Sequence, residues 1–293
     1  FILASVLILS FSCNKENDQS HMFETQDIHN FYEMLSQMKN ATSLNDTLKI
    51  LNESYIQKSS IGLKDYLKYE KRNNNRDIEQ EYLKIIRSFP KYFQSQKPLL
   101  SNIENQLNEY DKYFEKLEDV YPSAKFKTTY YSIGFFNTQG QVVPQNTIFV
   151  GLEASIRTEN TNYSELSGNY SWLKDEKATI KDLGYLVVHE NLHTLQMMEN
   201  SKSPVLDTAI SEGAAVFLTE YFCGKESLVG IAGVGQDMID YAKENKKEVW
   251  SEFGKDLKSS ENFSNWFWSS NSKYPASMGY YMGYMICKSF YEN

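Results

Sequence analysis

The sequence has few of the residues on which several common protein chemistries depend. It has only three cysteines and no Cys-x-x-Cys pair, which excludes a cysteine-based zinc finger and a dithiol redox motif. Its net charge is -8, with no basic surplus to neutralise phosphates, so we exclude nucleic acid as a partner. It has only four histidines, so a regular spacing between two of them carries weight.

The sequence also lacks an apolar run long enough to span a membrane. Residues 1–12, FILASVLILSFS, are uncharged, but a spanning helix needs about 20 apolar residues. This run is typical of a secretory signal, whose basic start we expect before Phe1, although a buried strand would also fit. Residues 9–13, LSFSC, resemble the lipobox of bacterial lipoproteins. The resemblance implies a lipidated Cys13, a polar tether over residues 13–24, and an exported protein anchored to the periplasmic or surface face of the cell envelope.

The rest of the chain predicts an α+β fold that is mostly helical. Helical periodicity covers residues 25–120 and includes one long helix over residues 97–121 that starts near Pro98. Two segments rich in β-branched and aromatic residues, 126–136 and 146–156, predict strands joined by a loop. Helical patterns return afterwards, and a short sheet followed by helices is an α+β pattern. Cys223 and Cys287 lie in apolar helical surroundings and are expected to be buried free thiols.

One motif combines two of the four histidines with a carboxylate. The stretch LVVHENLHTLQ, residues 186–196, lies in a predicted helix that starts with a capping box at Thr179. Residues four apart lie one turn apart on a helix, so His189 and His193 can both reach one ion. Zinc prefers neutral imidazole nitrogen, and Glu190 lies beside this pair, where a general base for a metal-bound water would be.

A third metal ligand is expected from the next helix. Residues 203–224 predict a helix that begins at Ser203 and Pro204 and stops at Gly224. In an antiparallel helix pair, Glu212 would lie against the two imidazoles, and the small residues after it permit a close approach. The alternative is that both histidines are core residues and Glu212 is a surface carboxylate.

HENLHTLQ together with ISEGAAVFLTE resembles the gluzincin clan of zinc metallopeptidases, and more narrowly the predicted zinc-dependent proteases among bacterial envelope lipoproteins. The resemblance covers residues 121–293 and implies a gluzincin-like core with a small sheet. It implies Zn²⁺ held by His189, His193 and Glu212, with Glu190 as the catalytic base. It also implies that the strand TIFVGLEA, residues 147–154, pairs with a peptide or protein substrate, although this segment also fits an ordinary sheet strand.

Other residues would support such a site. A peptidase needs a donor for the developing oxyanion, and Tyr280, Tyr281 and Tyr284 surround a close-packing face formed by two glycines four residues apart. The alternative is that these tyrosines belong to an aromatic core. Asp207 and Glu220 could orient an imidazole ring, although both also fit solvated carboxylates.

Three functions therefore compete. The first is a zinc-dependent metallopeptidase of the cell envelope that hydrolyses peptide bonds through a water activated by Glu190. The second is an envelope lipoprotein with a structural or vestigial zinc site that acts as a scaffold in motility or secretion. The third is a lipoprotein that binds glycans or nutrients, which gives no reason for the histidine motif.

Overall fold

The computed structural model describes residues 23–143, 147–175, 179–196, 203–225, 228–267 and 273–293. Over these residues the protein is mostly helical with one small mixed sheet, which confirms the α+β prediction. The predicted signal, Cys13 and most of the tether lie outside the described residues. None of the described helices combines the length and the apolar character needed to cross a bilayer.

Helices occupy the region for which the sequence predicts them. They are α1 (Gln26–Met38), α2 (Leu44–Leu51), α3 (Ile61–Asn73), α4 (Ile78–Ser88), α5 (Pro90–Leu100), α6 (Glu104–Leu107) and α7 (Asp111–Val120). The prediction of one long helix over residues 97–121 is wrong, because Pro98 lies inside α5 and the chain turns before α6. Buried side chains continue at helical spacing through that turn, at Leu100, Ile103 and Leu107, so periodicity does not reveal the bend.

Four short strands form the sheet. They are β1 (Phe23–Glu24), β2 (Thr129–Ser132), β3 (Gly140–Val143) and β4 (Thr147–Gly151), in the order β1-β2-β4-β3. The β1–β2 and β2–β4 pairs are parallel, and the β3–β4 pair is antiparallel. The prediction that residues 147–154 pair with a substrate is wrong, because β4 already has a neighbour on each side and continues into α8 (Leu152–Ser155). The edge strand beside β4 is β3, which lies in the predicted loop.

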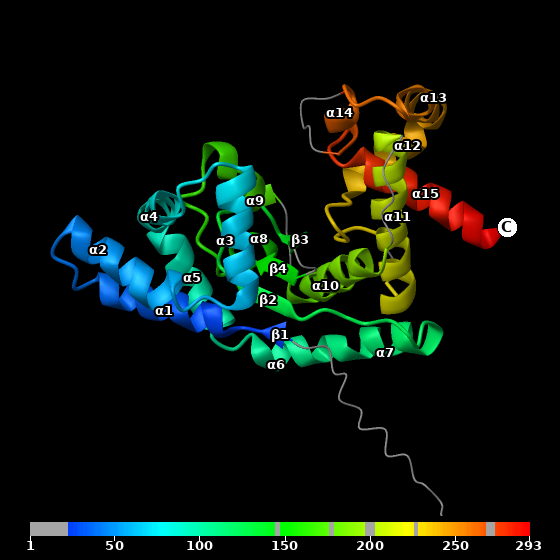
Figure 1. Ribbon diagram of the computed structural model, residues 1–293. Coiled ribbons are helices and arrows are strands. Elements are labelled where there is room, and N and C mark those ends of the chain that lie inside the picture. Colours follow the sequence, from blue (N-terminus) through cyan, green and yellow to red (C-terminus); the bar gives the residue numbers. More distant parts are fainter. Residues whose placement is uncertain (1–22, 144–146, 176–178, 197–202, 226–227, 268–272) are drawn as a thin grey trace, which may run out of the picture.

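The buried side chains form two apolar cores. The first contains the sheet, α1 to α7 and the metal-motif helix α10 (Ile180–Leu195), and so includes residues on both sides of position 120. The second is formed by α11 (Pro204–Cys223), α12 (Gln236–Glu244), α13 (Lys246–Asp256), α14 (Phe263–Phe267) and α15 (Met278–Glu292). Figure 1 shows α11 to α15 grouped on one side of the molecule, with α10 leading from the sheet towards them. A 3₁₀ turn at Gly168–Tyr170 and α9 (Trp172–Asp175) precede α10.

Two glycines let α11 and α15 cross with their backbones in contact. A Cβ atom added to Gly283 would lie 1.7 Å from the carbonyl oxygen of Ala209, and one added to Gly213 would lie 2.0 Å from the carbonyl carbon of Gly283. This crossing agrees with the predicted close-packing face around Gly279 and Gly283. Because α15 is held so tightly, the tyrosine beside this contact, Tyr280, is placed next to Glu212 of α11.

Candidate metal centre

The start of α10 is set by local hydrogen bonds. The backbone N–H of Thr179 donates to the Asp182 carboxylate at 2.8 Å, which is one half of the predicted capping box. Leu183, Val187 and Leu192 are buried and hold one side of the helix against the first core. The opposite side of α10 therefore carries its two histidines towards α11.

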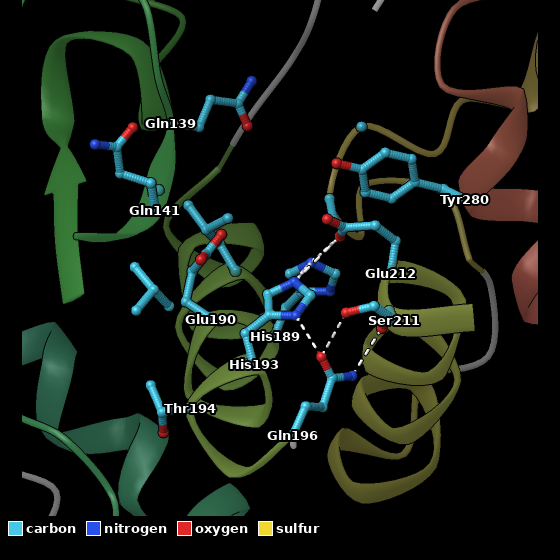
Figure 2. Close-up of a pocket in the computed structure, with 15 residues that line it drawn as sticks. Gln139, Gln141, His189, Glu190, His193, Thr194, Gln196, Ser211, Glu212 and Tyr280 are labelled. Atoms are coloured by element: carbon cyan, nitrogen blue, oxygen red, sulfur yellow. Dashed lines mark hydrogen bonds and ion pairs between the residues drawn. The ribbon is translucent and has the colours of Figure 1, made fainter. Parts of the chain in front are cut away.

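Three side chains from these two helices converge on one point (Figure 2). His189 Nε2 lies 3.3 Å and His193 Nε2 lies 3.1 Å from Glu212 Oε2, and the two nitrogens are 3.0 Å apart. Zinc bonds of 2.0–2.1 Å in a tetrahedron place neighbouring ligand atoms about 3.3 Å apart. The triangle of donor atoms therefore has the size of one face of a tetrahedral metal site.

Gln196 fixes the protonation pattern of His193. The Gln196 side-chain amide donates to the backbone carbonyl of Ser211 at 2.8 Å, which turns its oxygen towards His193 Nδ1 at 2.9 Å. That oxygen also accepts the Ser211 hydroxyl at 2.6 Å. An amide oxygen only accepts, so His193 Nδ1 carries a proton and Nε2 is the nitrogen that faces the donor triangle. The sequence reasoning missed Gln196, because its side chain acts across helices.

The charges of the triangle favour a cation. Burial alone would lower the pKa of His193, but hydrogen bonding and charge from Glu212 raise it. Burial alone would raise the pKa of Glu212, but the two histidines lower it, so Glu212 stays anionic. Burial lowers the pKa of His189, which keeps this imidazole neutral. One anion and two imidazoles are a donor set that a divalent transition-metal ion fits, and binding would displace the proton shared by His193 and Glu212.

A cavity of about 710 Å³ opens above this triangle. Its wall includes β3 residues Gly140, Gln141 and Val142, and Glu190 lies on that side of the cavity in Figure 2. Glu190 is only 8% exposed, and burial raises its pKa to about 7. It does not belong to the donor triangle, in which Glu212 supplies the carboxylate.

The three predicted tyrosines have different positions. Tyr280 lines the cavity, and its ring lies 6.5 Å from that of His189. Tyr284 instead donates to Glu220 at 2.8 Å, and Tyr281 is packed in the second apolar core. Glu220 therefore accepts a hydrogen bond from Tyr284 and does not orient an imidazole. Asp207 accepts the Ser203 backbone N–H at 3.2 Å, at the start of α11.

Comparison with known proteins identifies the family. The family model described as Gliding motility protein GldB matches residues 12–293. No curated protein and no solved structure matches the chain.

This match corrects the peptidase interpretation. The matching family is a motility family, so the assignment to the gluzincin clan, and with it the description of the protein as a zinc metallopeptidase and hydrolase, is wrong. The physical reason is that His-Glu-x-x-His with a downstream Glu specifies three donors on two helices, and such a donor set does not by itself specify a reaction. The match covers nearly all of the chain, and the chain therefore belongs to the GldB family of gliding motility lipoproteins, which are exported and held in the bacterial cell envelope by a lipid anchor.

Proposed function

We propose that this protein is a lipid-anchored scaffold of the gliding machinery, in which a bound divalent metal ion ties α10 to α11. Cys13 is the lipidated residue in this proposal, and the folded part binds other proteins of the machinery. The ligands are His189, His193 and Glu212, and zinc is the ion that two imidazoles and one carboxylate favour.

The observation that carries the proposal is the donor triangle, with sides of 3.0 to 3.3 Å. It joins α10, whose buried side chains belong to the first core, to α11, which contributes to both cores. An ion at this position would oppose separation of the two helices. A binding surface built from both sides of the molecule would therefore keep its shape.

In this proposal the ion cross-links the two helices, and neighbouring side chains orient its ligands. Gln196 holds the His193 ring with its lone pair towards the ion, and Tyr280 covers the Glu212 side. The chain supplies three ligands, so the fourth position of a tetrahedral ion would be left to water or to a group from a partner.

The test is metal content and metal-dependent stability of the purified chain. We expect about one zinc ion per chain and a rise in unfolding temperature on adding zinc, because an ion at about 1,000 times its Kd stabilises the fold by about 4 kcal/mol. His193→Ala should abolish both effects. His29→Ala is the matched control, since His29 lies beside Glu104, at 3.8 Å, away from the donor triangle.

The scaffold role is tested in cells that lack the native gene. Expression of the His193→Ala chain should leave gliding impaired, and expression of the His29→Ala chain should restore it. The proposal fails if zinc leaves the unfolding temperature of the unaltered protein unchanged, or if the His193→Ala chain restores gliding fully.

A further inference from the structure

A second chamber adjoins the cavity above the donor triangle. This chamber has a volume of about 620 Å³ and is walled largely by the glycine-rich loop at residues 229–235 and the start of α12. The two chambers share four wall residues, namely Gln139, Leu186, Ala232 and Gly233. Two adjoining chambers suit a long ligand, which can reach both, better than a compact one.

An edge strand forms part of the wall of the first chamber. Of the described strands, only β4 pairs with β3, so the other side of β3 has no strand beside it. Three β3 residues, Gly140, Gln141 and Val142, line the chamber. An edge strand in a cleft offers main-chain hydrogen bonds to an extended polypeptide. The ligand class that fits this wall is an extended protein segment.

The charged residues of the cleft wall are acidic. Neither chamber is lined by lysine or arginine among the described residues, and the carboxylates on the walls are Glu190, Glu212, Asp182 and Asp237. Glu212 belongs to the donor triangle. Asp182 caps α10, and its other oxygen lies 3.5 Å from the Lys225 ammonium group. Glu190 and Asp237 are the two carboxylates left for a ligand, one in each chamber.

Glu190 is the more informative of the two. Its side chain is more than nine-tenths buried, it faces the cavity in Figure 2, and no described residue donates a hydrogen bond to it. The Glu190 oxygens are not sealed away from the cavity, so a cationic group of a ligand in the cavity can pair with this carboxylate. The proposed metal site does not use Glu190, because Glu212 supplies the carboxylate of the donor triangle.

We propose that this cleft binds an extended segment of a protein partner through a basic side chain, with Glu190 accepting its ammonium or guanidinium group and Asp237 attracting a second basic residue. The proposal names the partner chemistry of the scaffold and rests on the scaffold function proposed above. Backbone pairing with β3 sets the direction of the segment, and the carboxylates select its side chains.

The test uses the full chain with zinc and three fluorescent peptides of about ten residues, capped at both ends, in which valine alternates with lysine, serine or glutamate. We expect the lysine peptide to bind at least tenfold more tightly than the serine peptide by fluorescence anisotropy, and the glutamate peptide to bind most weakly. Glu190→Gln should weaken the lysine peptide at least tenfold, because this change leaves a buried cation without its anion. Asp237→Asn should weaken it less, since Asp237 is exposed.

Glu244→Gln is the control for unspecific attraction to an acidic protein. Glu244 is an exposed residue at the far end of α12 and does not line either chamber, so its loss should leave peptide affinity unchanged. Equal binding of the lysine and serine peptides, or equal effects of Glu190→Gln and Glu244→Gln, would overturn the inference. Zinc content and unfolding temperature are measured on the same samples. If the protein binds zinc and zinc raises its unfolding temperature, but the peptides show no selectivity, only the inference about the partner is wrong.

Discussion

The crossing of α11 and α15 makes a sharp prediction about Gly283. In Gly283→Ala, the new Cβ would lie 1.7 Å from the Ala209 carbonyl oxygen, whereas ordinary contact begins near 3.4 Å. The helices must therefore separate locally by roughly 1.7 Å, because the colliding atoms belong to two backbones and cannot rotate away. A gap of 0.5–1 Å already removes a quarter to a half of a contact's dispersion energy, so we expect a loss of about 3 kcal/mol or more.

Two other glycines provide the comparison. A Cβ at Gly254, an exposed position of α13, would meet nothing within 4 Å, so Gly254→Ala should stabilise the protein by about 0.5–1 kcal/mol. A Cβ at Gly279 would meet the Phe267 ring at 2.4 Å, and a side chain can shift, so Gly279→Ala should fall between the other two variants.

The assay is urea unfolding followed by circular dichroism at a fixed zinc concentration. The expected order of stability is Gly254→Ala, the unaltered chain, Gly279→Ala and then Gly283→Ala. A Gly283→Ala protein within about 1 kcal/mol of the unaltered chain would refute the reasoning, because two backbones in contact could not then absorb a methyl group so easily.

Three further predictions concern single side chains. Gln196→Ala should weaken zinc binding ten- to a hundredfold in competition with a coloured chelator, because His193 loses the group that orients it; an unchanged affinity would show that the ring needs no such partner. Burial raises the pKa of Glu153 to about 7 from its ordinary 4.5, so the folded state keeps a proton that the unfolded chain releases. The free energy of unfolding should therefore fall by roughly 3 kcal/mol as the pH rises from about 4.5 to about 7, and Glu153→Gln should flatten this slope in urea titrations at several pH values. Thr179→Ala should lower the free energy of unfolding by about 1 kcal/mol through loss of the α10 cap, and a loss below 0.2 kcal/mol would show that the cap contributes nothing.

The sequence predicts most reliably what depends on neighbours along the chain. The start of α10 at Thr179, the start of α11 at Pro204 and its stop at Gly224 all follow from capping chemistry, and the structure has them there. The approach of Glu212 to the histidines was predictable for the same reason. The sequence shows which face of each helix carries these residues, and the short connection between the two helices favours an antiparallel pair. The glycine contact of α15 likewise follows from a spacing of four residues.

What the sequence could not show depends on contacts between distant segments. Strand β3 has only four residues, of which only Val142 and Val143 favour a strand, so it does not stand out from a loop, and it is defined by its pairing with β4. The choice of Tyr280 over Tyr281 and Tyr284 depends on how α15 is rotated against α11. The peptidase interpretation failed for a related reason. Local sequence motifs identify the ligands of a metal site, but they do not identify the function of that site.

The strand β1 is the first described element after the proposed lipid anchor. With the anchor at Cys13, as proposed, a pull between the membrane and a partner would reach the described part of the fold at Phe23. There it meets a strand of two residues, paired only with Thr129 and Tyr130, and then α1, whose Ile28, Phe31 and Met34 are fully packed in the first core. The short strand would peel away at low force, because few hydrogen bonds hold it, while α1 would resist. The molecule would thus lengthen slightly under tension before its binding cleft is disturbed.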